Sequence, residues 1–295
     1  MYRLLVICLL CCVACQEKEP CDYIENYYQD VYKAELAYWE KDYQTAYDLL
    51  KKVESRCGLL NQYITREPEM MAKLSIKVGK PQAAFPYIER MLKEGMSFDS
   101  FVNNDTYTIL HEYEEWRYLE RNATQFATEF EEGINQELRE EIIAMNMLDQ
   151  AVRQKPIDYI QMAKVDSIHQ LRVKEIFREY GYPTAKMVGK DNRAIGERVE
   201  LRTLFFHLDD TTYFKPILLK MIRDGEAPAY ILGTMLDSRQ RSRRVYDYGI
   251  YDNADSSRIL DLKNLDKRRI SVGLPPWGLK KKVDSLRRAY YSNQY

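Results

Sequence analysis

The stretch YWEKDYQTAYDLLKKV, residues 38–53, sets the architecture that we expect for the first part of the chain. Upstream of it, tyrosines and aliphatic residues recur near helical spacing. The charged residues Glu40, Lys41 and Asp42 interrupt this pattern, and apolar residues then resume from Tyr43 at i, i+3, i+4 and i+7. Two amphipathic helices joined by such a short turn form a helical hairpin, so the sequence predicts one around this stretch.

The same stretch resembles the turn of a tetratricopeptide repeat, with Ala46 and Leu50 where that family packs its second helix. A weaker copy at residues 72–95, AKLSIKVGKPQAAFPYIERMLKEG, has Ala84 in the place of Ala46. The resemblance implies tetratricopeptide-like helical hairpins over residues 22–134, stacked because each hairpin needs a neighbour to bury its face. It also implies a protein partner bound through these N-terminal hairpins, although most of the tyrosines are expected to pack between helices.

Cys21 and Cys57 flank the predicted hairpin. One lies just before the first helix, the other lies at the end of the second, and the midpoint between them falls at residue 39, in the turn. An antiparallel hairpin folded there brings both ends together. Outside the cytoplasm such a pair oxidises, so we expect a disulfide. The alternative is two separate free thiols.

The first twenty residues, MYRLLVICLLCCVACQEKEP, have the pattern of a secretory signal. Arg3 is the one charge before Gln16, and an apolar run from Leu4 to Ala14 follows it. This run is shorter than the roughly 20 apolar residues that a membrane-spanning helix needs. The sequence therefore predicts an exported protein.

The segment from Cys12 to Cys15 resembles the lipobox of bacterial lipoproteins, although Cys12 stands where leucine is usual. The resemblance implies a lipoprotein signal peptide over residues 1–14, acylation of Cys15, and a tether over residues 15–21. Acyl chains on Cys15 would make the lipid membrane a partner. We therefore expect a cell-envelope, outer-membrane lipoprotein.

The short charged stretch after Cys15, QEKE at residues 16–19, resembles the surface-export signals of some lipoproteins. The sequence therefore leaves open whether the protein is on the periplasmic or the surface face of the outer membrane. An ordinary cleaved signal that releases a secreted protein is the alternative to the lipid anchor.

The composition favours a mainly α protein without a nucleic-acid partner. The chain of 295 residues has 44 basic and 45 acidic residues, a balance that predicts no nucleic-acid binding. Only 12 glycines and 10 prolines argue against a turn-rich β-sandwich. The three histidines at 111, 169 and 207 are far apart in sequence, and the cysteines of the mature chain have other expected roles. We therefore expect no metal site and no cofactor.

Residues 135–295 are predicted to form a helical domain with one small β-hairpin. Asn135 is placed to cap one helix, and another is expected from about Tyr159 to Tyr180, ended by Gly181. The segments RVYDYGIYD and SRILDL, with turn residues between them, suggest the hairpin. A short helix after Asn264 and a terminal helix with a basic face complete the domain.

From about residue 148 to residue 276 the chain resembles domain of unknown function 6624. The resemblance rests on these blocks, in order: LDQAVR, VDSIHQLRVKEIFREYGYPTAKMVG, FFH, APAYILGTMLDSR, YDYGIYD and DKRRISVGLPP. It implies no reaction. The chain departs from the family in having serine at 238, where arginine is usual after Asp237, and Ile-Tyr after Tyr248-Gly249, where Thr-Gln is usual.

His207 is the leading single candidate for a functional residue. It follows the apolar run Leu204-Phe205-Phe206, and the family resemblance places a histidine there. Imidazole titrates near neutral pH and can transfer a proton or orient a carboxylate. The remaining candidates are Asp237 and Arg268 for catalysis, and Tyr248, Arg269, Asp149 and Gln150 for binding.

These residues support two hypotheses. The leading one is a membrane-anchored lipoprotein that binds a protein or a small ligand. The alternative is an enzyme that acts on a small anionic substrate, with His207 as acid–base and with Asp237 and Arg268 or Arg269 holding the anion. A third reading of the Asp237 and arginine set is a buried network that closes the hairpin onto the helices.

Overall fold

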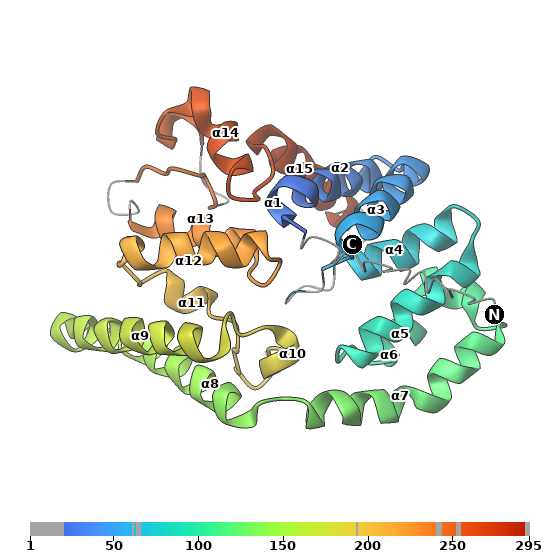
Figure 1. Cartoon of the computed structure of the whole chain (residues 1–295), viewed down its shortest axis with the longest axis horizontal. Helices are drawn as coiled ribbons and strands as arrows, with labels where there is room; N and C mark the ends of the chain where they lie inside the picture. Colours follow the sequence, from blue (N-terminus) through green and yellow to red (C-terminus); the bar gives the residue numbers. More distant parts are fainter. Residues whose placement is uncertain are drawn as a thin grey trace, which may run out of the picture.

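The structure is a computed structural model that describes residues 21–60, 62, 66–192, 194–239, 244–251 and 255–292. The predicted signal peptide, Cys15 and all of the tether but Cys21 lie outside these described residues. Within them the chain is mainly helical, as the sequence predicted (Figure 1). No helix among the described residues is both long enough and apolar enough to cross a bilayer.

The first half of the described chain is a succession of helices in which α2 packs on α3, α3 on α4, α4 on α5 and α5 on α7. Figure 1 shows α7 leading from this group, in blue and cyan, to the helices of the second half. The elements of this half are α1 (Tyr23–Asn26), α2 (Tyr28–Trp39), α3 (Tyr43–Cys57), α4 (Arg66–Lys77), η1 (Pro81–Ala84), α5 (Phe85–Lys93), α6 (Asp99–Val102), η2 (Asp105–Leu110) and α7 (Glu114–Glu132).

The second half begins with a long helical pair, α8 and α9, which pack on each other. Shorter helices and loops follow, and the chain then returns to the first half. The elements are α8 (Gln136–Ala151), α9 (Tyr159–Tyr180), α10 (Ala185–Val188), α11 (Arg202–Phe205), α12 (Thr211–Arg223), α13 (Ala229–Arg239), η4 (Ser256–Arg258), η5 (Leu262–Asn264), α14 (Leu265–Ile270) and α15 (Trp277–Ser292).

Small residues let α2 and α3 approach closely. Ala34 and Ala46 are both fully buried, and neither side chain holds the two helix axes apart. In the turn between the helices Lys41 has a left-handed backbone, with φ of 65°. Asp42 then caps α3, since its carboxylate accepts a hydrogen bond from the Thr45 amide at 3.2 Å. The charged turn in the sequence thus ends one helix and starts the next.

The two helices predicted after Asn135 are confirmed. The Asn135 side chain accepts a hydrogen bond from the Leu138 amide at 3.0 Å, which satisfies one of the unpaired donors at the start of α8. The α9 helix runs over Tyr159–Tyr180, and Gly181 ends it with φ of 72°, a left-handed backbone that suits glycine.

The predicted β-hairpin is absent from the described residues. In its place, the two segments meet in one parallel bridge between Tyr246 and Ile259. The physical reason is that the Asp237 carboxylate binds the backbone amides of Asp247, Tyr248 and Ile250, so these donors are not available to a partner strand.

The last described helix packs on the first long one. Figure 1 shows α15, in red, beside α2, in blue, and the two helices are joined by ion pairs between Arg287 and Glu35 and between Lys282 and Glu40. A further ion pair joins Arg223, at the end of α12, to Asp22. Contacts therefore cross the boundary between residues 22–134 and 135–295, and that division stays a prediction.

The predicted disulfide is present. Cys21 and Cys57 are bonded, with Cα atoms 5.3 Å apart. Next to the bond, the Tyr23 hydroxyl donates a hydrogen bond to the Cys57 carbonyl at 2.6 Å, so the chain before α1 is fixed to the end of α3 by two contacts. The distance between the Cα atoms lies in the normal range for disulfides.

Replacing Cys21 and Cys57 together by serine should lower the free energy of unfolding by about 3–4 kcal/mol. The bond closes a loop between residues 36 positions apart, and this reduces the conformational entropy of the unfolded chain. Urea unfolding of the oxidised protein and of the double variant measures the difference. Dithiothreitol should bring the wild type to the level of the variant and leave the variant unchanged. Two alkylatable thiols in the native protein would contradict the prediction.

Candidate functional site

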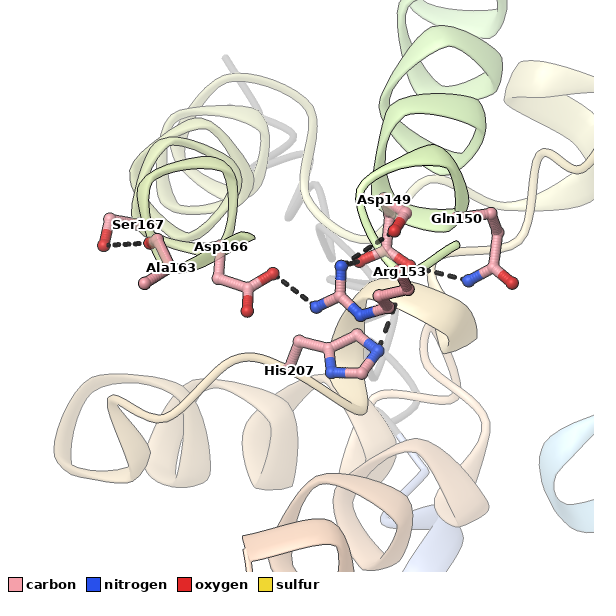
Figure 2. Close-up of polar contacts among 7 residues, drawn as sticks. All are labelled: Asp149, Gln150, Arg153, Ala163, Asp166, Ser167 and His207. Atoms are coloured by element: carbon pink, nitrogen blue, oxygen red, sulfur yellow. Dashed lines mark hydrogen bonds and ion pairs between the residues drawn. The ribbon is translucent and has the colours of Figure 1, made fainter. Parts of the chain in front are cut away.

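His207 lies beside a buried carboxylate at the meeting point of α8, α9 and α11 (Figure 2). Its Nε2 is 3.9 Å from Oδ2 of Asp149, whose side chain is 1% exposed. Asp149 Oδ1 is 3.0 Å from Arg153 Nη1, and the Gln150 amide donates a hydrogen bond to Asp149 Oδ2 at 2.8 Å. The other end of the Arg153 guanidinium pairs with Asp166 of α9. We call these five residues the His207 cluster.

The contacts of the His207 cluster mainly link α8 to α9. Asp149 is already neutralised by Arg153 and accepts a hydrogen bond from Gln150, so its charge is shared among three neighbours. The 3.9 Å separation from His207 exceeds hydrogen-bond length. A buried carboxylate with such partners stabilises the contact between α8 and α9. Its Oδ1 has the ion pair with Arg153 and no hydrogen bond among the described residues.

A second histidine, His169, faces the same charges. It lies on α9 and is 4% exposed, and its Nδ1 has no hydrogen-bond partner among the described residues. Burial lowers the pKa of His169, while the nearby carboxylates of Asp149 and Asp166 act in the opposite direction. His169 is therefore buried in its neutral form at neutral pH.

Asp237 is the centre of a second polar network, here called the Asp237 network. The side chain is fully buried on α13 and accepts hydrogen bonds from the amides of Asp247, Tyr248 and Ile250, each at 2.8 Å. Burial raises the pKa of the Asp237 carboxyl, and the three amide donors act against this shift. With three backbone donors on its two oxygens, the carboxylate holds the loop after α13.

Arg268 and Arg269 fasten the same loop from α14. The Arg268 guanidinium donates to the carbonyls of Asp247, at 3.1 and 3.2 Å, and Asp261, at 3.0 Å. Arg269 is fully buried and donates to the carbonyls of Tyr248 and, at 2.6 Å, Pro275. These contacts are those of a buried network that closes the loop onto the helices.

The contacts thus divide the sequence-predicted residues into two groups. His207 lies with Asp149 and Gln150, and the second group is Asp237, Tyr248, Arg268 and Arg269. Asp149 and Gln150, two of the sequence-predicted binding candidates, thus lie with His207, while Asp237, Tyr248 and the two arginines do not. Cys15 lies outside the described residues, whereas Cys21 and Cys57 form their bond.

A groove that the sequence analysis did not identify lies where α15 meets the first helices. It has a volume of about 920 Å³ and is bordered by α2, α4, the segment from α6 to η2, and α15. We call it the aromatic groove. Its lining residues are Glu35, Tyr38, Trp39, Lys41, Tyr43, Glu69, Met70, Lys73, Lys77, Ser100, Asn103, Asn104, Asp105, Thr106, Arg287, Tyr290 and Tyr291.

A continuous row of rings gives the aromatic groove its character. Tyr43 contacts Tyr38 with centroids 5.8 Å apart, and Tyr38 contacts Trp39 at 5.4 Å. Trp39 in turn lies 5.5 Å from Tyr290 and 6.3 Å from Tyr291. The two terminal tyrosines are 49% and 51% exposed, so the row offers ring surface to a ligand. The sequence shows Tyr38-Trp39 and Tyr290-Tyr291 as two pairs of adjacent aromatic residues. Because about 250 residues separate the two pairs, the sequence did not indicate that they meet in one groove.

The part of the chain that the structure describes contains no group of side chains suited to hold a metal ion. None of its His, Cys, Asp and Glu side chains form a group of three or more that could hold an ion. The polar groups of the two networks bind backbone amides, carbonyls and each other.

The free energy of unfolding should decrease as the pH falls below about 6.5, because buried His169 then has to take up a proton. Its pKa is lower in the folded than in the unfolded chain, so between the two values the unfolded chain binds more protons. The stabilisation is complete above the unfolded pKa and is lost through this window, with a slope of at most about 1.4 kcal/mol per pH unit.

Urea unfolding at about pH 7.5 and about pH 5.5 measures this loss, in a range where histidines titrate. The wild type should lose more stability than His169→Asn between the two conditions. His111→Asn is the control for histidine replacement in general, since the His111 ring lies 4.3 Å from the Trp116 ring, outside the His207 cluster. An equal loss in the wild type and in His169→Asn would show that His169 does not carry the effect.

Comparison of the chain with models of protein families, with curated proteins and with solved structures finds no match in any of the three.

Proposed function

We propose that the protein is a binding module held at a membrane of the cell envelope by acyl chains on Cys15. Its described helices would form the body that the tether carries. The lipobox-like segment before Cys15 and the short apolar run upstream support the anchor. The Cys21–Cys57 bond supports an oxidising surrounding, as expected outside the cytoplasm. The outer membrane is the proposed location, on its periplasmic or its surface face.

The observation that carries the binding function is the aromatic groove. It is lined by α2 and α4, the helices that begin successive pairs in the tetratricopeptide-like order proposed for residues 22–134. In that architecture the first helices of successive pairs lie side by side and form the concave face. The α15 helix closes one side of the groove with Tyr290 and Tyr291.

The occupant that fits this groove is an extended segment of a partner protein. The row of rings supplies large and rigid contact surface, which interfaces use as anchors. The lining also includes the hydroxyl groups of Ser100 and Thr106 and the side-chain amide of Asn103, which can pair with the backbone of an extended chain. Charges of both signs line the groove, so a partner with mixed charge is favoured over a polyanion.

The enzyme alternative receives less support from the geometry. Catalysis with His207 requires Asp237 to face the same substrate, whereas the Asp237 carboxylate binds three backbone amides in a network separate from the His207 cluster. The resemblance of residues 148–276 to domain of unknown function 6624 stays a proposal, carried by the sequence blocks alone, and adds no reaction.

Replacing Cys15 by serine should abolish lipid attachment, because the acylated thiol is the proposed anchor. Growth of an expressing bacterium with radiolabelled palmitate, followed by membrane fractionation, tests this. The wild type should carry label and sediment with membranes, whereas Cys15→Ser should carry none. Cys12→Ser, which changes a cysteine of the proposed leader, should still be labelled. An unlabelled wild type that retains Met1 would contradict the anchor.

Replacing Trp39 by alanine should weaken binding of an extended peptide by about tenfold or more, because central aromatic anchors dominate such interfaces. Peptides selected on the native protein from an unbiased library provide the probes, and fluorescence anisotropy measures their dissociation constants. Tyr290→Ala should weaken the same peptides to a smaller degree, since its ring is half exposed at the edge of the groove.

Tyr159→Ala is the matched control, because Tyr159 is an exposed tyrosine of α9 outside the aromatic groove. It should leave the dissociation constants unchanged, and circular dichroism should show that all variants keep their helices. Peptide binding that is indifferent to Trp39→Ala, or binding of glycans with no binding of peptides, would overturn the proposed occupant.

A further inference from the structure

A second cavity, separate in character from the aromatic groove, lies between α2, the start of α13 and the segment from α14 to α15. It has a volume of about 400 Å³, within the range of small-molecule sites. Apolar and aromatic side chains from both halves of the chain form much of its wall, including Tyr32, Tyr230 and Ile250. We call it the arginine cleft, since Arg202 and Arg269 belong to its lining.

Arg269 is a buried cation that the fold has only partly satisfied. The side chain is fully buried, and its Nε and Nη1 atoms donate to the carbonyls of Pro275 and Tyr248. Its Nη2 has no hydrogen-bond partner among the described residues, and none of them forms an ion pair with it. Burial disfavours this charge, and the carboxylates of Asp237, Asp266 and Asp284 offset part of that cost without forming an ion pair. A buried donor without an acceptor adds to the cost. The arginine cleft therefore has a positive charge in its wall.

Among the other charged side chains of the arginine cleft, two pairs of opposite charge cancel and one further arginine remains. Lys280 pairs with Asp284, and Arg287 pairs with Glu35, so these four compensate each other. Arg202 has no carboxylate partner among the described residues, and its guanidinium lies 5.4 Å from the centre of the Tyr230 ring.

Glu67 is the remaining acid of the arginine cleft. It lies near Tyr28, where its charge adds to the effect of burial in raising the tyrosine pKa. The wall thus has an acidic side at Glu67, next to Tyr28, and two guanidinium groups, Arg202 and Arg269, that form no direct ion pair with a described carboxylate.

We propose that the arginine cleft binds a small soluble organic anion, with its carboxylate or phosphate group toward Arg202 and Arg269 and its apolar body against the tyrosines. Arginine suits both kinds of anion, because its planar group offers several charged donors. Arg202 is exposed at the surface and meets the ligand first, whereas Arg269 acts from within the wall, where the lower dielectric strengthens its attraction. The tyrosine rings set the size and shape of the body that fits.

Three matched aromatic probes test the proposal on the native protein. Benzoate and phenyl phosphate carry the two anionic groups, and benzamide has the same ring without the charge. Calorimetric titration should show binding of the two anions, which should also raise the melting temperature with rising concentration. Benzamide should bind at least about tenfold more weakly, as expected where a charged hydrogen bond is lost. Equal binding of all three probes would overturn the proposal.

Variants locate the site. Arg202→Gln should weaken binding of the anions by about tenfold or more without changing the fold, because Arg202 is exposed and has no ion pair within the described part of the chain. Arg269→Gln removes the second charge, and its result counts only if circular dichroism shows native helix content. Arg117→Gln is the control, because Arg117 is an exposed arginine of α7 outside the arginine cleft, and it should leave anion binding unchanged. Anion binding that survives Arg202→Gln unchanged would place the site elsewhere and refute the assignment.

A final arm separates a free anion from a lipid headgroup. Vesicles of phosphatidylglycerol offer the same phosphate group on a membrane surface, and the chain without its acyl group is used so that the anchor cannot contribute. Binding to vesicles together with failure of every soluble probe would overturn the proposal. The anion site and the aromatic groove can be tested separately, since Trp39→Ala removes no residue that lines the arginine cleft.

Discussion

The ion pair between Glu35 on α2 and Arg287 on α15 is the contact on which both cavities depend. It joins residues 252 positions apart and fixes the last helix against the first long one. Glu35 is 5% exposed, so removal of Arg287 would take a cation away from a buried carboxylate, which destabilises proteins by several kcal/mol in typical cases, roughly 3–5 kcal/mol. Both the aromatic groove and the arginine cleft include these two residues in their linings, and neither would keep its shape if α15 moved away.

A second constraint acts on the loop after α13. Asp237 uses its carboxylate to bind three successive parts of that loop, and Arg268 and Arg269 bind the loop carbonyls from the other side. Backbone amides and carbonyls that could pair with a neighbouring strand are instead hydrogen-bonded to side chains. The described residues of this loop therefore form no strand, and the loop leads from α13 to α14, the helix that contains Arg269.

Local signals were sufficient to predict much of the helical fold. Asn135 and Gly181 mark helix ends through hydrogen bonds and backbone angles that depend on a few neighbouring residues, and both predictions are confirmed. Cys21 and Cys57 were predictable because antiparallel helices of similar length bring their outer ends together. The β-hairpin failed for the opposite reason. Alternating residues after Arg244 matched a strand, but the pattern contains no information about a buried carboxylate on α13 that takes the amides.

The candidate sites were harder to predict, because each gathers residues that are distant in sequence. Asp149, Gln150 and His207 were named as separate candidates, and only the packing of α8 against α11 places them together. Trp39 and Tyr290 gave no joint signal, since aromatic residues at helical spacing are as typical of packing as of binding. Arg269 was singled out as part of a family block, whereas the donor that it leaves unpaired is a property of the fold alone.

The shared wall of the two cavities gives the molecule a means of communication. Arg287 contacts Glu35 and lies near the Trp39 ring, with 5.8 Å between its guanidinium carbon and the ring centre, and it borders both spaces. If an anion on one side draws Arg287 toward itself, the change in Trp39 alters the affinity for a peptide on the other side. Thermodynamic reciprocity then requires the peptide to alter anion affinity by the same factor. A single side chain would in this way make the occupancy of each cavity a report on the other.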